Sequence, residues 1–185
     1  IIRRRKRFRK LRQARKYDRI VVLTQQDLKL WQQCCPKVSY VYNEVTIQPV
    51  KVYDYAAKRV IAVGRLTFQK GFDHLVSAWA IVSKSFPDWQ LDIYGEGELR
   101  GKLQQQIDTL GLHDNVHLVG NHADMPIEYA KHSIAVMSSN FEGLPLALLE
   151  AASCGLPLVA YDCQCGPREV IADGENGYLV PKVGD

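Results

Sequence analysis

The sequence lacks the features that mark membrane-spanning, secreted and metal-binding proteins. No apolar run approaches the roughly 18 residues of a membrane-spanning helix, and no apolar segment follows the basic N-terminus as it would in a secretory signal. The five cysteines are an odd number with no Cys-x-x-Cys pair, and the five histidines show no metal-ligand spacing. We therefore expect a protein of the reducing cytoplasm, without a disulfide framework or a bound metal or cofactor.

Charge is distributed unevenly along the chain. Residues 1–19 hold 11 of the 24 Lys and Arg residues and one of the 20 acidic residues, so the remainder is mildly acidic although the formal net charge is +4. A basic segment of this kind is often the solvated face of a helix. The functional alternative is a peripheral contact of residues 3–19 with an anionic membrane, which we favour over binding to nucleic acid.

From residue 58 onward, short apolar runs alternate with amphipathic segments. The β-branched runs predict six strands, at 59–64, 91–94, 115–120, 134–137, 156–160 and 177–180. Apolar residues at every third or fourth position predict helices between them, at 71–86, 99–110, 125–131 and 145–154. Apolar strands separated by helices indicate a parallel sheet covered on both faces. The predicted fold class is therefore α/β, with a doubly wound parallel sheet.

The first 57 residues do not suffice for a domain. They contain a buried-looking strand at 19–24, a helix that a capping box at Thr24 would start, and extended pieces up to residue 52. One strand and one helix cannot bury their own apolar faces. We expect residues 1–57 to be the end of a preceding domain plus a linker and residues 58–185 to be the main domain, with the fold incomplete at both ends.

The loop after the first strand of this domain carries two cations at a helix entrance. Residues 64–71 read Gly-Arg-Leu-Thr-Phe-Gln-Lys-Gly, which sets Arg65 and Lys70 five positions apart beside the small Gly64. A guanidinium fork, a compact ammonium and the N–H groups of a helix N-terminus together suit a diphosphate. Two solvated loop cations are the alternative, and the spacing is not that of a P-loop.

Two glutamates bracket the start of the helix predicted at 145–154. Glu142 precedes this helix and Glu150 lies within its apolar stretch, where a carboxylate needs a partner or a function. Each carboxylate can accept from vicinal sugar hydroxyls. The stretch that opens the helix comprises Gly143, Leu144, Pro145 and Leu146. Its backbone N–H groups suit sugar or phosphate oxygens. The alternative is that Glu142 only interacts with the helix dipole and that Glu150 lies on a solvated face.

A third loop imitates a dinucleotide-binding fingerprint. Gly95, Gly97 and Gly101 follow a strand, but Glu96 and Glu98 stand between them, where a pyrophosphate requires positive potential. The loop also follows the second strand of the domain rather than the first. An NAD-dependent oxidoreductase is therefore the least favoured interpretation.

Five motifs in one order resemble the nucleotide-sugar-binding C-terminal domain of the retaining GT-B glycosyltransferases of family 4 (group 1). They are Gly-Arg-Leu…Lys-Gly (64–71), Gly-Glu-Gly (95–97), Val-x-Leu-Val-Gly (116–120), Phe-Glu-Gly-Leu-Pro-x4-Glu-Ala (141–151) and Asp-Gly-x-x-Gly-Tyr-Leu-Val (173–180). Within the family, Tyr-Asp-Cys-x-x-Gly-Pro (161–167) and Leu-Thr-x-x-Asp (23–27) are most similar to bacterial enzymes that assemble exopolysaccharide, capsule or lipopolysaccharide.

The resemblance implies transfer of a hexose from a nucleotide diphosphate sugar to a saccharide or lipid-linked acceptor, with retention and without a metal. Arg65 and Lys70 would hold the diphosphate, and Glu142 would face the donor sugar. Glu150 would accept from the ribose, and Asn121 would border the base.

The resemblance also places the acceptor pocket in the preceding domain. We therefore expect this chain alone to bind a donor without turning it over. A non-catalytic module that binds sugar nucleotides stays the main alternative.

Overall fold

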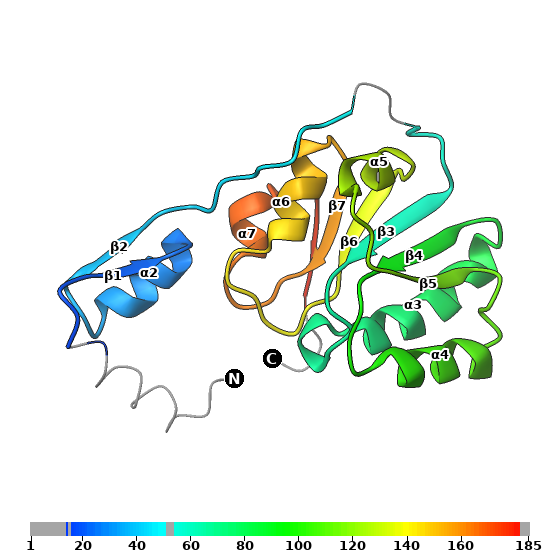
Figure 1. The fold of residues 1–185 in the computed structure, drawn as a ribbon, viewed down its shortest axis with the longest axis horizontal. Coiled ribbons are helices and arrows are strands. Elements are labelled where there is room, and N and C mark those ends of the chain that lie inside the picture. Colours follow the sequence, from blue (N-terminus) through cyan, green and yellow to red (C-terminus); the bar gives the residue numbers. More distant parts are fainter. Residues whose placement is uncertain (1–13, 15, 51–53, 182–185) are drawn as a thin grey trace. The chain divides into compact units, whose positions relative to one another are not determined.

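The computed structural model describes residues 14, 16–50 and 54–181 (Figure 1). The chain divides into two compact units, Ile1–Glu44 and Val45–Asp185. The second unit begins ahead of residue 58, and Ile47 packs against one of its hydrophobic cores. The assignment of residues 1–57 to a preceding domain and linker stays a prediction. Most of the basic arm, at 3–13 and 15, lies outside the described residues, and so does the membrane contact predicted for it.

The first unit contains two short parallel strands and a helix. Strand β1 (Ile20–Val22) pairs with β2 (Val38–Tyr40), and helix α2 (Gln25–Gln32) connects them. The predicted capping box is confirmed at its N-cap, because Thr24 Oγ1 accepts from the Asp27 N–H at 3.0 Å. The expectation of a buried strand holds for Val22, which is 8% exposed, and is wrong for Val21, which is 57% exposed, since a two-stranded sheet with one helix leaves a face open.

The second unit is built on a six-stranded parallel sheet. Its strands are β3 (Arg59–Val63), β4 (Gln90–Tyr94), β5 (Val116–Gly120), β6 (Ile134–Met137), β7 (Leu158–Tyr161) and β8 (Gly177–Val180). They lie in the order β5-β4-β3-β6-β7-β8, and every pairing is parallel. This is the strand order of a doubly wound nucleotide-binding sheet, so the predicted fold class is confirmed.

Helices follow the strands as the apolar periodicity predicts. They are α3 (Phe72–Ser85), α4 (Arg100–Thr109), α5 (Met125–Ala130) and α6 (Leu146–Ser153). Two short elements were not predicted, the 3₁₀ turn η1 (Phe68–Lys70) and α7 (Pro167–Val170), because three or four residues show no periodicity. None of the described helices is long and apolar enough to cross a membrane.

Alternate residues of the central strand enter two separate cores. Val60 and Ala62 pack with α3 and α4 on one face, and Ile61 packs with α5 and α6 on the other (Figure 1). Both faces of β3 are therefore apolar, as expected for a parallel sheet with helices on each side.

The chain reverses its winding direction between β3 and β6, which are neighbours in the sheet. The loops that follow these strands, 64–71 and 138–145, therefore leave the same carboxyl edge side by side. In doubly wound folds this switch point is where ligands bind. It carries most of the residues that the sequence singles out.

Candidate functional site

Lys70 and Glu142 meet at the switch point. The Lys70 ammonium lies 2.7 Å from Glu142 Oε1, and the side chains are 17% and 7% exposed. Ser139 Oγ donates to the same carboxylate oxygen at 2.7 Å. The loops after β3 and β6 are thus joined by a charge-assisted contact that is largely shielded from water.

Backbone contacts lock the same two loops together. Ser138 Oγ donates to the Lys70 carbonyl at 3.0 Å. Asn140 donates from its backbone N–H to the Gln69 carbonyl at 2.7 Å and from its side chain to the Phe68 carbonyl at 2.6 Å. These contacts fix the register of one loop against the other, so the Lys70–Glu142 pair rests on a rigid support.

Gly64 provides room for the lysine. A Cβ at Gly64 would lie 2.9 Å from Lys70 Cε and 3.0 Å from its Cδ, so the aliphatic stem of Lys70 passes directly over this glycine. Any larger residue at position 64 would displace the ammonium. The sequence indicated a small residue here, and the structure shows that it accommodates the side chain of Lys70.

Arg65 and Asn121 remain open to solvent. Arg65 is exposed, and no hydrogen bond or ion pair links its guanidinium to another described residue. Asn121 follows β5 and is likewise exposed. Both come from the carboxyl edge, but no hydrogen bond or ion pair within the described part of the chain joins either one to the Lys70–Glu142 pair.

The stretch from Gly143 to Leu146 leaves backbone donors free. Pro145 is the N-cap of α6, one position earlier than the first helical turn in which the sequence placed it. Among the described residues, no acceptor takes the N–H groups of Gly143, Leu144 or Leu146. Pro145 has no N–H, so these three are among the donors that the helix start offers to a ligand.

Glu150 is held by a neighbouring helix. The buried Tyr129 on α5 donates to Glu150 Oε2 at 3.1 Å and also lies 3.2 Å from the Ala147 carbonyl. Burial and the adjacent carboxylate both raise the pKa of Tyr129 well above its ordinary value, so its hydroxyl stays a donor. Glu150 is half-buried, and its second oxygen, Oε1, has no partner among the described residues.

The glycines of the loop after β4 allow close packing between loops. A Cβ at Gly95 would lie 2.0 Å from the Gly64 carbonyl oxygen, and one at Gly97 would lie 2.4 Å from that of Leu66. The Leu66 N–H also donates to the Glu96 carbonyl at 2.9 Å. These glycines bring the loops after β4 and β3 together, which explains the pattern without a dinucleotide.

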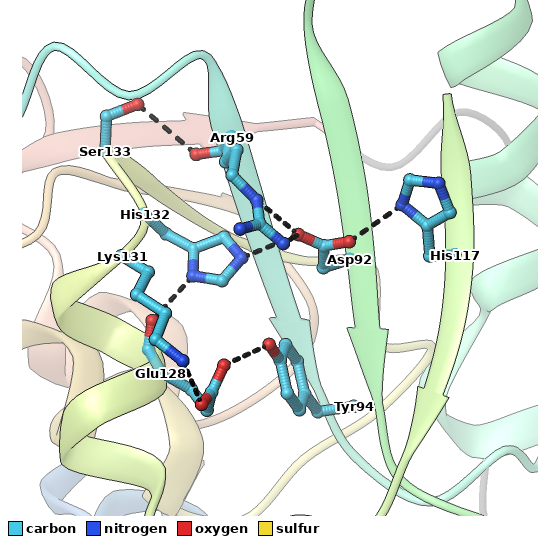
Figure 2. A network of polar contacts seen from close by, with 8 residues as sticks. All are labelled: Arg59, Asp92, Tyr94, His117, Glu128, Lys131, His132 and Ser133. Atoms are coloured by element: carbon cyan, nitrogen blue, oxygen red, sulfur yellow. Dashed lines mark hydrogen bonds and ion pairs between the residues drawn. The ribbon is translucent and has the colours of Figure 1, made fainter. Parts of the chain in front are cut away.

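Sequence reasoning missed a buried carboxylate on β4 (Figure 2). Asp92 is 1% exposed and accepts from Arg59 Nε, His117 Nδ1 and His132 Nε2, each at 2.9 Å. Burial alone would raise the pKa of Asp92, but the hydrogen bonds from His132, Arg59 and His117 outweigh it and lower the pKa to about 2. An aspartate inside an otherwise apolar strand was the signal that could have found this network.

The network continues toward the carboxyl edge. His132 Nδ1 lies 2.6 Å from the Glu128 carbonyl oxygen. The Glu128 carboxylate accepts from Tyr94 at 2.6 Å and from Lys131 at 2.8 Å. Burial would raise the pKa of Glu128, yet Lys131 and Tyr94 hold it below its usual value. His122, next to Asn121 in the chain, lies 3.6 Å from the same carboxylate, so the network reaches the loop after β5.

A large cavity of the second unit lies away from the switch point. It has a volume of about 600 Å³ and is lined by Val50, Asp54, Ala57, Arg59, Ile127, Ala130 and Lys131. Its two cations are already engaged, Arg59 by Asp92 and Lys131 by Glu128. Neither cation is therefore free to hold an anionic ligand, and we assign the cavity no function.

A doubly wound sheet with a shielded Lys–Glu pair and free N–H groups at its switch point defines an α/β domain of the Rossmann-like kind found in GT-B proteins. Residues 48–185 match the family model of the glycosyl transferases group 1, and the chain belongs to that family.

Individual relatives agree with this assignment. An uncharacterized glycosyltransferase of Haemophilus influenzae is 35% identical over 88% of this chain and 47% of its own length. The amylovoran biosynthesis glycosyltransferase AmsD of Erwinia amylovora is 35% identical over 88% and 48%, respectively. A crystal structure of a point mutant of S. aureus TarM in complex with Fondaparinux, alpha-GlcNAc-glycerol and UDP superposes with a TM-score of 0.90. It is 27% identical and matches 98% of this chain and 37% of TarM. The chain thus spans less than half the length of these relatives.

Proposed function

We propose that this chain supplies the donor-binding half of a retaining glycosyltransferase of family 4. The enzyme would transfer a hexose from a nucleotide diphosphate sugar to a saccharide or lipid-linked acceptor. The observation that carries the proposal is the 2.7 Å contact between Lys70 and Glu142 at the switch point, with free backbone donors beside it.

The two cations of the first loop would hold the diphosphate. Lys70 is rigidly placed over Gly64, and Arg65 is exposed without a described partner. As the bond between the anomeric carbon and the diphosphate breaks, the electron pair stays on the leaving phosphate oxygen. A guanidinium and an ammonium set in advance stabilise that developing charge.

The loop after β6 and helix α6 would hold the sugar and the ribose. Glu142 would accept from hydroxyls of the donor sugar, assisted by the N–H groups of Gly143 and Leu144. Glu150 has an unpartnered oxygen on a side chain that Tyr129 already orients, which suits ribose hydroxyls. Asn121 would border the base from the loop after β5.

Metal independence is part of the proposal. Among the described residues, no three His, Cys, Asp or Glu side chains gather as a metal-binding group. Arg65, Lys70 and the N-terminus of α6 provide the positive potential that a metal would otherwise bring to a diphosphate.

The relatives support a UDP-sugar as donor. The TarM structure is described in complex with UDP, and that of the pneumococcal O-GlcNAc transferase GtfA, 29% identical to this chain, in complex with UDP and GlcNAc. AmsD is named for amylovoran biosynthesis. We therefore propose a UDP-hexose donor and a role in building a bacterial surface polysaccharide.

Calorimetric titration of the chain with UDP, GDP and NAD, each with and without chelator, tests the proposal. We expect micromolar-to-millimolar binding of UDP or GDP that chelator does not change. Lys70→Ala should weaken it, and Lys102→Ala, an exposed lysine on α4, is the matched control. Binding of NAD with no binding of either diphosphate would overturn the proposal in favour of an oxidoreductase.

We propose a cytoplasmic location with peripheral membrane contact through residues 3–19. Each well-placed cation contributes about 1 kcal/mol at an anionic surface. Co-sedimentation with vesicles should rise with their phosphatidylserine content and fall at high salt. Sedimentation that is independent of anionic lipid would contradict the contact.

A further inference from the structure

Two left-handed glycines hold the two ends of the loop that carries Glu142. At the start of the loop, a Cβ on Gly71 (φ +61°) would lie 2.3 Å from the Ser138 carbonyl oxygen. At its end, a Cβ on Gly166 (φ +95°) would lie 2.2 Å from the Gly143 carbonyl oxygen and 2.7 Å from Pro145 Cδ. Real Cβ atoms do not approach so closely, so only glycine fits at these two points of contact with the loop.

Gly166 belongs to the loop between β7 and α7, which is not part of the diphosphate or ribose contacts proposed above. Strand β7 lies next to β6, so this loop leaves the sheet beside the Gly143–Leu146 stretch. The preceding Cys165 has φ +66°, the one positive φ among the described non-glycine residues, and is buried. Such a backbone persists only where its surroundings impose it.

An ion pair stabilises the loop between β7 and α7. Arg168 donates through Nε to Asp162 Oδ1 at 2.7 Å and through Nη2 to Asp162 Oδ2. The two residues stand at either end of the turn, so the bidentate contact closes it. The turn that presents Gly166 is therefore held from both sides.

We propose that Gly166 is a positioning residue for the donor sugar. By contacting the Gly143 carbonyl, it sets the backbone next to Glu142 and the free N–H groups that follow it. The inference rests on the proposed function, because it assumes that Glu142 and these N–H groups face the sugar. Lys70 also lies over Gly64, and Glu150 is oriented by Tyr129, so both side chains have supports outside the Gly166 contact.

A methyl group at position 166 would therefore act selectively. The atoms it meets belong to the backbone and a proline ring, which cannot rotate away, so the Gly143–Pro145 stretch must shift. The shift falls first on the backbone next to Glu142 and on the N–H groups proposed for the sugar, whereas Arg65, the Lys70 stem over Gly64 and the Glu150–Tyr129 contact lie outside the stretch that must move. A general loss of structure would instead weaken every ligand alike.

The test compares Gly166→Ala with Gly174→Ala. Gly174 also has a left-handed φ, +82°, but a Cβ there meets nothing within 4 Å, so it reproduces the backbone strain without the contact. Calorimetry would measure the affinity of each variant for UDP, UDP-glucose and UDP-N-acetylglucosamine. We expect Gly166→Ala to weaken the better UDP-sugar by about tenfold and UDP by less than about threefold, and Gly174→Ala to change neither.

The outcomes separate the inference from the proposed function. Equal losses for UDP and the UDP-sugar, or no loss in a folded Gly166→Ala variant, would overturn the positioning role. If the unchanged chain binds no nucleotide, the proposed function fails. The amide NMR signals of Gly143 and Leu144 then decide the inference: a change in Gly166→Ala that Gly174→Ala lacks supports it, and no change overturns it.

Asp162→Asn is the alternative test variant if Gly166→Ala does not fold. It weakens the contact with Arg168 without adding an atom at the Gly143 contact. We expect Asp162→Asn to weaken binding of the UDP-sugar more than binding of UDP, with smaller losses than in Gly166→Ala. An unchanged ratio of the two affinities would overturn the inference.

Discussion

Lys70 Nζ lies 2.7 Å from Glu142 Oε1, although the two residues stand 72 positions apart in the chain. The contact neutralises both charges, and it occupies the ammonium that a diphosphate would need. Under the proposed function, a nucleotide would therefore compete with Glu142 for Lys70.

Glu142→Gln should strengthen UDP binding while it weakens transfer. The neutral amide no longer competes for Lys70 or repels the diphosphate, so we expect the Kd for UDP to fall by about threefold to tenfold. Transfer by the enzyme should fall because the carboxylate that we propose to face the sugar is lost. Calorimetry measures the Kd for UDP, and a donor-consumption assay measures the rate of transfer. Glu98→Gln, which removes an exposed charge at the same sheet edge, should change neither. Weaker UDP binding by Glu142→Gln would show that the pair does not compete with ligand.

The Lys70–Glu142 pair should also contribute to the free energy of unfolding. Lys70→Met leaves the Glu142 carboxylate, 7% exposed, with Ser139 as its remaining described donor. We expect a loss of about 1–3 kcal/mol in the free energy of unfolding, measured by urea titration. The double variant Lys70→Met/Glu142→Gln should regain most of that loss, because no uncompensated charge is left. A double variant as unstable as Lys70→Met would mean that packing of the lysine stem, rather than charge, accounts for the effect.

The strands and longer helices could be predicted because each leaves a local signal. Phe72, Leu75, Val76 and Trp79 repeat with the period of a helix and are all buried in α3. The motif loops could be placed at the carboxyl edge because parallel strands all end there. These inferences need only the sequence near each residue.

The Asp92 network and the Glu150–Tyr129 contact could not be predicted in the same way. Asp92 meets Arg59, His117 and His132 because β4 lies between β3 and β5 and α5 covers that face. Strand order is set by the packing of the whole sheet, and no local period reveals it. The role of Gly166 depends likewise on β7 lying next to β6.

Asp92 should make the stability of the chain acid-sensitive. Its pKa is lowered from 3.8 to about 2 on folding, so its contribution is fully present above pH 4 and is lost as the pH falls through 2. The shift corresponds to about 2 kcal/mol at neutral pH. Asp92→Asn should therefore be less stable than the unchanged chain at pH 7, and the difference should shrink between pH 4 and pH 2. Urea titrations across this range measure it. A difference that stays constant with pH would exclude the carboxylate as its source.

Glu150 offers a test that isolates the ribose. If its free oxygen accepts from the ribose hydroxyls, Glu150→Ala should weaken UDP by about 1–3 kcal/mol and leave the affinity for 2′,3′-dideoxy-UDP unchanged, because that analogue lacks the hydroxyls. Tyr129→Phe separates orientation from contact: it removes the hydrogen bond to Glu150 Oε2 but keeps the carboxylate. We expect it to weaken UDP less than Glu150→Ala does. Equal losses for UDP and the dideoxy analogue in Glu150→Ala would place Glu150 away from the ribose, since a contact with the diphosphate or base would affect both ligands alike.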